Sequence, residues 1–143
     1  MSFDPDALRA LGGRPSRTRR PVTFGFLLRV GVAAGLAAAG TNLLLLLLAT
    51  WGGWDITAPG QASVDALPIV LVCLLAGGFG AVGAYIAARV TKRPEVWVVV
   101  VGAVLFLASI NDLPRTLQAM HLVATLWVVG WLTRAVLRGS HLG

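Results

Sequence analysis

Four long apolar runs, separated by short polar segments, constrain the fold of this chain more than any other feature. They cover residues 22–51, 66–89, 95–113 and 114–134. Each has about 20 residues or more, enough for one helix to cross a hydrocarbon layer about 30 Å thick. A spanning segment must be helical, because lipid offers its backbone polar groups no hydrogen-bond partner. The runs therefore predict an all-α integral membrane protein, a four-helix transmembrane bundle.

The composition agrees with a chain that is surrounded by a lipid bilayer. Of the 143 residues, 57% are hydrophobic and only 13% are charged, which is far from the balance of a soluble globular protein. The formal net charge of +6 would suggest a nucleic-acid partner in a soluble chain. Here the basic residues flank the apolar runs, so we expect no nucleic-acid binding.

The distribution of basic residues predicts the orientation of the bundle. They gather before the first run, between the second and third runs, and after the fourth, whereas only Arg115 lies on the other side. By the positive-inside rule, both termini are cytoplasmic (N-in/C-in), and the loop at 52–65 and the corner at 111–115 face outward. We expect three parts: a flexible basic cytoplasmic tail (1–21), a four-helix transmembrane domain (22–134) and a short cytoplasmic tail (135–143).

Small residues recur at a spacing of four in the first two runs, which lets helix backbones approach each other closely. Such a surface favours packing between helices, and also self-association or binding to another membrane subunit. The residues predicted to pack are Gly31, Gly35, Gly77, Gly80 and Ala84.

Polar residues that can carry chemistry are concentrated at 109–121, where the third helix should end and the fourth begin. Arg115, Gln118, His121 and Thr125 fall within an arc of about 120° on a helix. Asn42 of the first run is predicted at a similar depth to His121, about 13 Å from the outer edge at 1.5 Å per residue. An amide at that depth needs a hydrogen-bond partner.

Three interpretations of these residues remain open. In the first, Asp112 pairs with Arg115, and Gln118 and His121 bond to neighbouring helices. In the second, they line an outward-facing ligand pocket together with Asn42 and Thr125, with His121 and Asp112 as catalytic candidates. The third is a proton or solute pathway. We expect no cofactor and no metal, because His141, the other histidine, lies in the opposite tail.

Known classes of small membrane protein fit the sequence poorly. Small multidrug exporters carry an acidic residue in the first helix, and the run at 22–51 has none. Quinone reductases with thiol sites need paired cysteines, but Cys73 is the single cysteine and is expected to be a small buried hydrophobe. The glycines of the second run lack the strand and the Lys-Ser/Thr pair of a nucleotide-binding loop.

Three segments carry a resemblance to a family. They are Asn42 before its leucine run, the corner at 109–114 and the Met-His-Leu-Val-Ala segment at 120–124. With the four-helix layout, they resemble a family of small actinomycete membrane proteins catalogued as a domain of unknown function. The resemblance implies a bacterial inner-membrane location and recurrent polar positions at Asn42, Asp112 and His121.

The function expected from these features is binding, or conversion, of a small lipophilic molecule in an intramembrane pocket that opens outward. The alternatives are a non-catalytic accessory or structural subunit of a membrane complex, and a small-solute transporter.

Overall fold

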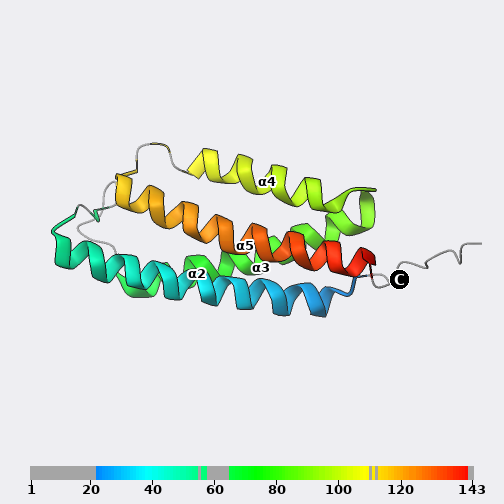
Figure 1. Ribbon diagram of the computed structural model, residues 1–143, viewed down its shortest axis with the longest axis horizontal. Helices are drawn as coiled ribbons and strands as arrows, with labels where there is room; N and C mark the ends of the chain where they lie inside the picture. The colour runs from blue at the N-terminus through cyan, green and yellow to red at the C-terminus, as the bar shows by residue number, and fades with distance from the viewer. Residues whose placement is uncertain (1–21, 55, 58–64, 110, 112, 142–143) are drawn as a thin grey trace, which may run out of the picture.

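The computed structural model describes residues 22–54, 56–57, 65–109, 111 and 113–141, and this part of the chain forms four α-helices (Figure 1). They are α2 (Phe24–Gly52), α3 (Ala66–Val90), α4 (Pro94–Ser109) and α5 (Arg115–His141). The described part of the chain contains no strand. The prediction of an all-α, four-helix bundle is confirmed. The basic tail at 1–21 and Asp112 lie outside the described residues.

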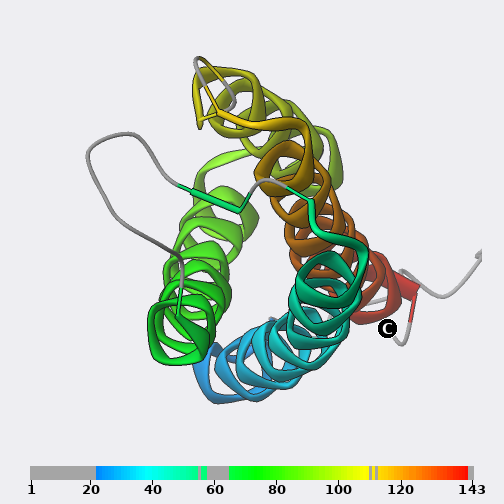
Figure 2. The same cartoon turned by 90° about the vertical axis from the view of Figure 1, so that its left-hand side faces the viewer.

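The helices surround a common axis, with α2 and α4 on opposite sides (Figure 2). Contacts join α2 to α3 and α5, and join α4 to the same two helices, while α3 and α5 also touch each other. Helices α2 and α4 make no contact in the described structure. Helix α4 therefore lies along the side of α3 and α5, away from α2.

Three of the helices are long and apolar enough to cross a membrane: α2 (29 residues), α3 (25 residues) and residues 115–139 of α5. Helix α4 is apolar but has only 16 residues. At 1.5 Å per residue it is about 24 Å long, shorter than a hydrocarbon core of about 30 Å. Figure 1 shows that α4 ends short of the end of the bundle where α5 begins.

Two helix boundaries differ from the sequence prediction. The third apolar run was expected to be helical through residue 113, but α4 ends at Ser109. Pro114 disfavours helical geometry at the residue before it, and Asn111 favours a turn. The tail expected after Arg134 is helical to His141, because a basic residue at a membrane surface does not itself end a helix.

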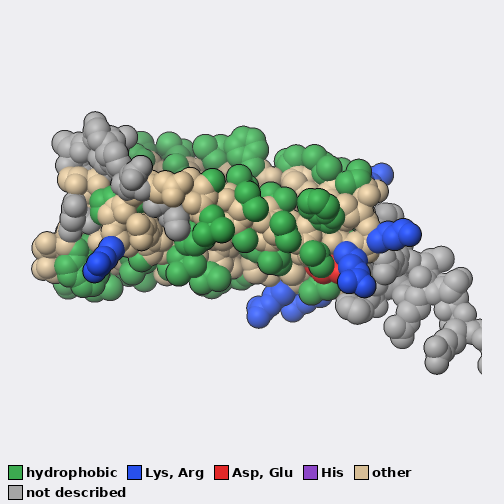
Figure 3. Space-filling view, turned by 90° about the horizontal axis from the view of Figure 1, so that it is seen from above, with side chains coloured by type: hydrophobic (Ala, Val, Ile, Leu, Met, Phe, Trp, Pro, Cys, Tyr) green, Lys and Arg blue, Asp and Glu red, His purple; other side chains and the backbone are tan. Residues whose placement is uncertain are grey.

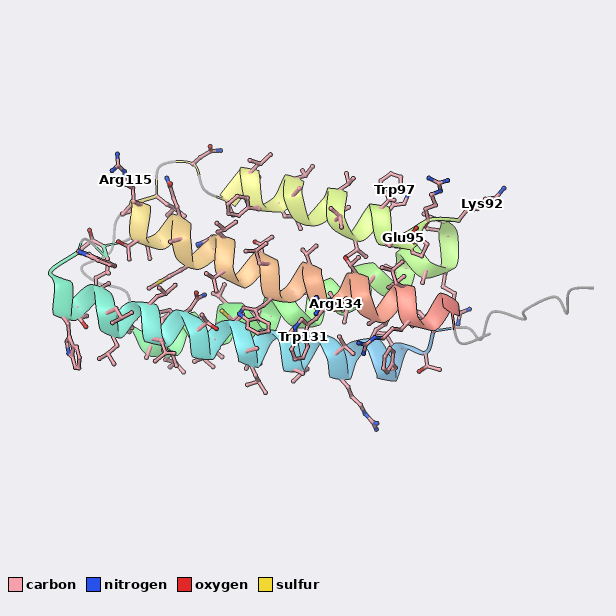
Figure 4. All side chains as sticks on the ribbon, viewed as in Figure 1. Lys92, Glu95, Trp97, Arg115, Trp131 and Arg134 are labelled. Atoms are coloured by element: carbon pink, nitrogen blue, oxygen red, sulfur yellow. The ribbon has the colours of Figure 1, made fainter. Side chains whose placement is uncertain are left out.

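The bundle has two ends, named here by what they carry. The basic end is formed by the start of α2, the turn at 91–93 and the end of α5. The corner end is formed by the end of α2, the start of α3 and the start of α5. Figure 3 shows most of the visible Lys and Arg side chains at the basic end, and Figure 4 shows Arg115 at the corner end.

Buried side chains form one cluster in each half of the bundle. The cluster toward the basic end joins α2, α3 and α5 through Leu27, Ala81, Leu132 and their neighbours. The cluster toward the corner end joins the same three helices through buried residues that include a thiol and a thioether: Ala38, Ala39, Ile69, Cys73, Leu117 and Met120. Helix α4, all of which is described, contributes no buried residue to either cluster.

Glycine allows α2 and α3 to meet at backbone distance. A Cβ atom on Gly31 would collide with the Gly77 carbonyl oxygen, and a Cβ atom on Gly77 would collide with the Gly31 carbonyl oxygen. A Cβ atom on Gly35 would lie 2.7 Å from the Cys73 carbonyl oxygen. This close approach fixes the register in which residues farther along α2 and α3 face each other.

The remaining packing candidates lie near α5 or inside the bundle. A Cβ atom on Gly80 would lie 2.8 Å from Leu132 Cδ1 and 3.0 Å from Val128 Cγ1, both on α5. Ala84 is buried in the cluster toward the basic end.

Candidate functional site

Asn42 is the buried polar residue around which the candidate site is built. Asn42 is only 4% exposed and lies in the corner-end half of α2. It lies seven residues after Gly35, and seven residues are close to two helical turns, so both positions lie on the face of α2 that is turned toward α3. The glycine contact therefore brings Asn42 against the backbone and side chains of α3.

The partner of Asn42 is the single cysteine of the chain. Asn42 Nδ2 donates a hydrogen bond to Cys73 Sγ over 3.5 Å, whereas Asn42 Oδ1 is buried without a hydrogen-bond partner in the described structure. Cys73 therefore satisfies only one end of the amide, and the carbonyl oxygen is the end left without a partner among the described residues.

The buried cluster in this half of the bundle is apolar apart from the Cys73 thiol. It includes Ala38, Leu117 and Met120. A buried polar group without a partner costs about 1–3 kcal/mol. An unpaired acceptor in such surroundings is therefore a specific place for a hydrogen-bond donor.

Most of the candidate polar side chains of α5 form hydrogen bonds with backbone carbonyls of α5 itself or of the residues just before it. Gln118 Nε2 donates to the Leu113 carbonyl over 2.9 Å, and Thr125 Oγ1 donates to the His121 carbonyl over 2.8 Å. Such local bonds are common for polar side chains without an outside partner. Arg115 is exposed at the corner end and points away from the bundle (Figure 4).

His121 is held in the same way, and the contact fixes its tautomer. Its Nδ1 lies 3.0 Å from the Leu117 carbonyl oxygen. A carbonyl oxygen only accepts hydrogen bonds, so the bond requires the proton on Nδ1. In the neutral ring the lone pair is then on Nε2, which makes this nitrogen a second acceptor in the corner-end half.

Helical positions show which neighbours the α5 side chains face. His121 lies seven residues before Val128, which lies beside Gly80 of α3. Gln118 lies eleven residues before Val129, which packs against Gly102 of α4, and eleven residues correspond to about three turns. By spacing, His121 thus lies on the face of α5 that carries Val128, whereas Gln118 lies on the face that carries Val129.

The candidate residues thus do not form one set of mutual contacts in the described structure. Asn42 bonds to Cys73, while Gln118, His121 and Thr125 bond to backbone carbonyls. Asp112 lies outside the described residues.

Two interactions at this level were not anticipated from the sequence. Cys73 accepts from Asn42, and Trp127 Nε1 donates to Thr41 Oγ1 over 3.1 Å, which joins α5 to α2. The first had only a partial signal: the seven-residue spacing puts Asn42 on the same face of α2 as Gly35, but it does not show which residue of α3 lies within reach. The second had no comparable signal, because a tryptophan near the end of an apolar run is typical of the membrane interface and does not indicate a partner on another helix.

The described residues hold no group of three or more His, Cys, Asp and Glu side chains that could bind a metal ion. Comparisons of the chain with models of protein families, with curated proteins and with solved structures found no match.

Proposed function

We propose that the protein binds a small lipophilic molecule inside the membrane, and that a hydroxyl or N–H group of this molecule donates a hydrogen bond to Asn42. The unpaired Asn42 Oδ1, buried between α2 and α3, is the observation that carries the proposal. We place the protein in a bacterial inner membrane with both termini cytoplasmic. This orientation is supported by the basic residues at the end of the bundle opposite Arg115.

The chemistry of the site favours a ligand that is mostly apolar and has one or two donor groups. The buried cluster in the same half of the bundle offers alanine methyl groups, Met120 and Leu117, which suit a hydrocarbon body. The two acceptors described above, Asn42 Oδ1 and His121 Nε2, suit donors rather than acceptors. A ligand whose only polar group is a carbonyl or an ether would leave Asn42 Oδ1 unpaired, so we expect weak binding of such molecules.

The proposal is tested by what co-purifies with the protein. The parent and Asn42→Val, which removes the amide at similar volume, are purified in mild detergent from the same membranes. Their organic extracts are then compared by mass spectrometry. We expect a lipophilic alcohol, phenol or amide that is enriched with the parent and lost from Asn42→Val.

Thr133→Val is a matched control, because Thr133 Oγ1 is the other buried side-chain atom without a partner in the described structure. Thr133 lies in the half of α5 toward the basic end, whereas Asn42 lies in the corner-end half of the bundle. The Thr133→Val variant should therefore retain the molecule. Equal enrichment in all three proteins, or enrichment in none, would contradict the proposal.

A second candidate function, a non-catalytic subunit of a membrane complex, is favoured by α4. This helix has no buried residue and exposes a row of large apolar side chains, which can contact either lipid or another apolar helix. Cysteine crosslinking from Val104→Cys in native membranes distinguishes these neighbours. A discrete crosslinked product indicates a second copy or another subunit, whereas an uncrosslinked monomer indicates lipid around α4.

A further inference from the structure

A stripe of two aromatic and two basic residues follows one face of α5 toward the basic end. Its members, here called the α5 stripe, are Trp127, Trp131, Arg134 and Arg138. Their spacings of four, three and four residues keep them on one side of a helix with 3.6 residues per turn. Neither the Asn42 site nor the buried clusters explain why aromatic and basic residues are combined on this face.

The stripe borders α2. The bond from Trp127 to Thr41 joins one end of the stripe to α2, and Figure 4 shows Trp131 and Arg134 on the side of α5 that faces this helix. The two indoles pack edge to face with ring centroids 5.5 Å apart. Trp131 is still 36% exposed. An apolar surface with aromatic rings is therefore left open beside the seam between α2 and α5.

The two arginines lie at the depth of lipid headgroups. Arg134 follows Arg115 by nineteen residues, which correspond to about 28 Å along a helix, close to the thickness of a hydrocarbon core. Arg138 lies one turn, about 6 Å, farther out. With Arg115 at one hydrocarbon boundary, Arg134 reaches the other, and Arg138 lies within the headgroup layer. Trp127 and Trp131 are then level with acyl chains.

The positive charges of the stripe are not neutralised by described residues of the protein. Neither Arg134 nor Arg138 takes part in an ion pair with a described residue. Arg89, at the same end, differs: its Nη2 donates to the Tyr85 hydroxyl over 2.6 Å, and its guanidinium lies 5.0 Å from the centre of that ring. Among the described residues of the basic end, Glu95 is the one acidic side chain, and neither arginine of the stripe pairs with it.

We propose that the α5 stripe binds one anionic phospholipid. Arg134 and Arg138 hold its phosphate, and one acyl chain lies along Trp131 and Trp127 beside α2. Guanidinium groups bind phosphate oxygens through paired hydrogen bonds. Each basic residue near an anionic membrane surface contributes about 1 kcal/mol. The site is independent of Asn42, and a bound lipid would stabilise the contact between α5 and α2.

A competing explanation is that these arginines only orient the helices by charge, as Lys92 and Arg93 in the α3–α4 turn can do. The two explanations differ in what they require of neighbouring residues. Orientation depends on the number of charges, whereas a lipid site depends on their position beside Trp131.

Native mass spectrometry of the detergent-purified protein tests the proposal. Phosphatidylglycerol or phosphatidylcholine with identical acyl chains is added to the parent, to R134Q/R138Q and to K92Q/R93Q. The parent should retain one phosphatidylglycerol in preference to phosphatidylcholine. R134Q/R138Q should weaken retention roughly 30-fold, whereas K92Q/R93Q, with the same change of charge, should change it little.

Two further arms test each half of the site. Trp131→Leu should lower retention of phosphatidylglycerol while all charges remain, and inorganic phosphate should not displace the lipid. Equal losses in the two double variants, equal retention of the two lipids, or displacement by inorganic phosphate would overturn the proposal. If R134Q/R138Q does not fold into a monodisperse protein, Arg138→Gln and Trp131→Leu carry the same comparison.

Discussion

The contact between α2 and α3 and the outer helix α4 represent two ways of holding an apolar helix in one bundle. In the first, Gly31 and Gly77 bring two backbones together, and buried side chains continue the contact on both sides. In the second, α4 packs through Gly102 against Val129, and none of its residues is buried. Hydropathy does not distinguish the two contacts, because valine and leucine are as apolar as lipid. They differ in what the glycine faces, which is a glycine backbone in the first contact and a valine side chain in the second.

This difference separates the parts of the molecule that can carry specificity. The tightly packed side of the bundle holds Asn42 in one place, so a ligand there meets a fixed acceptor. Helix α4 offers a surface that lipid or a partner can cover in many ways. The following predictions test the comparison, from the largest expected effect to the smallest.

Two leucine truncations should give the largest difference. Leu132 is 1% exposed in the cluster toward the basic end, whereas Leu105 of α4 is 64% exposed. We expect Leu132→Ala to lower the free energy of unfolding by about 2–5 kcal/mol, because it leaves a cavity. Leu105→Ala should change it by less than about 0.5 kcal/mol. Reversible unfolding by SDS in mixed micelles measures both, and similar losses would show that α4 is packed as tightly as α5.

The glycine contact itself is tested by Gly77→Ala. Its added Cβ would meet the Gly31 backbone, which cannot move aside as a side chain can, and we expect a loss of about 1–3 kcal/mol. Gly83→Ala is the matched control on the same helix, since a Cβ atom there meets nothing within 4 Å. It should be neutral or stabilising by up to about 1 kcal/mol. Equal unfolding midpoints for the two variants would remove the backbone contact from the account.

The buried amide gives a smaller effect of opposite sign. In ligand-free protein, Asn42→Val removes an unpaired acceptor and also one weak interhelical hydrogen bond. An unpaired buried group costs about 1–3 kcal/mol and the bond contributes about 0.6 kcal/mol, so we expect a net stabilisation of about 1 kcal/mol. The same unfolding titration in synthetic lipid measures it. A clear destabilisation would assign Asn42 a structural role.

The contact of α4 should be the most tolerant. A Cβ atom on Gly102 would meet Val129 Cγ2, and a valine side chain can change its rotamer at a cost of about 1 kcal/mol. We therefore expect Gly102→Ala to cost less than Gly77→Ala does. Gly130→Ala, where a Cβ atom has open space, is the control on α5. Unfolding midpoints rank the four glycine variants, and a larger loss at Gly102 than at Gly77 would reverse the comparison.

Much of the fold follows from the sequence, because lipid leaves a long apolar run only the helical conformation. The starts of α2 and α3 were predicted to within two residues. The end of α5 was missed because Arg134 was interpreted as the boundary of the helix, although it is only the boundary of the apolar segment. The third run was predicted too long, since its last residues lie just before Pro114 and cannot continue the helix.

The candidate site was less predictable, for a physical reason. Spacing places Gln118, His121 and Thr125 on one side of a helix, but each can bond to its own backbone, and spacing does not show which partner it takes. Asn42 cannot satisfy both ends of its amide in this way, so it needed a partner on another helix. Its spacing from Gly35 indicates that α3 supplies this partner.

The hydrogen-bond state of the Asn42 carbonyl tests the central claim most directly. The chain has two asparagines, Asn42 and Asn111, so selective ¹³C labelling of asparagine in an Asn111→Ser background reports Asn42 alone. Isotope-edited infrared spectra of its side-chain carbonyl are compared in synthetic lipid and in native membrane extract. We predict a free carbonyl in synthetic lipid and a shift to lower frequency in the extract. A carbonyl that is already hydrogen-bonded in synthetic lipid, or identical in both, would contradict the account.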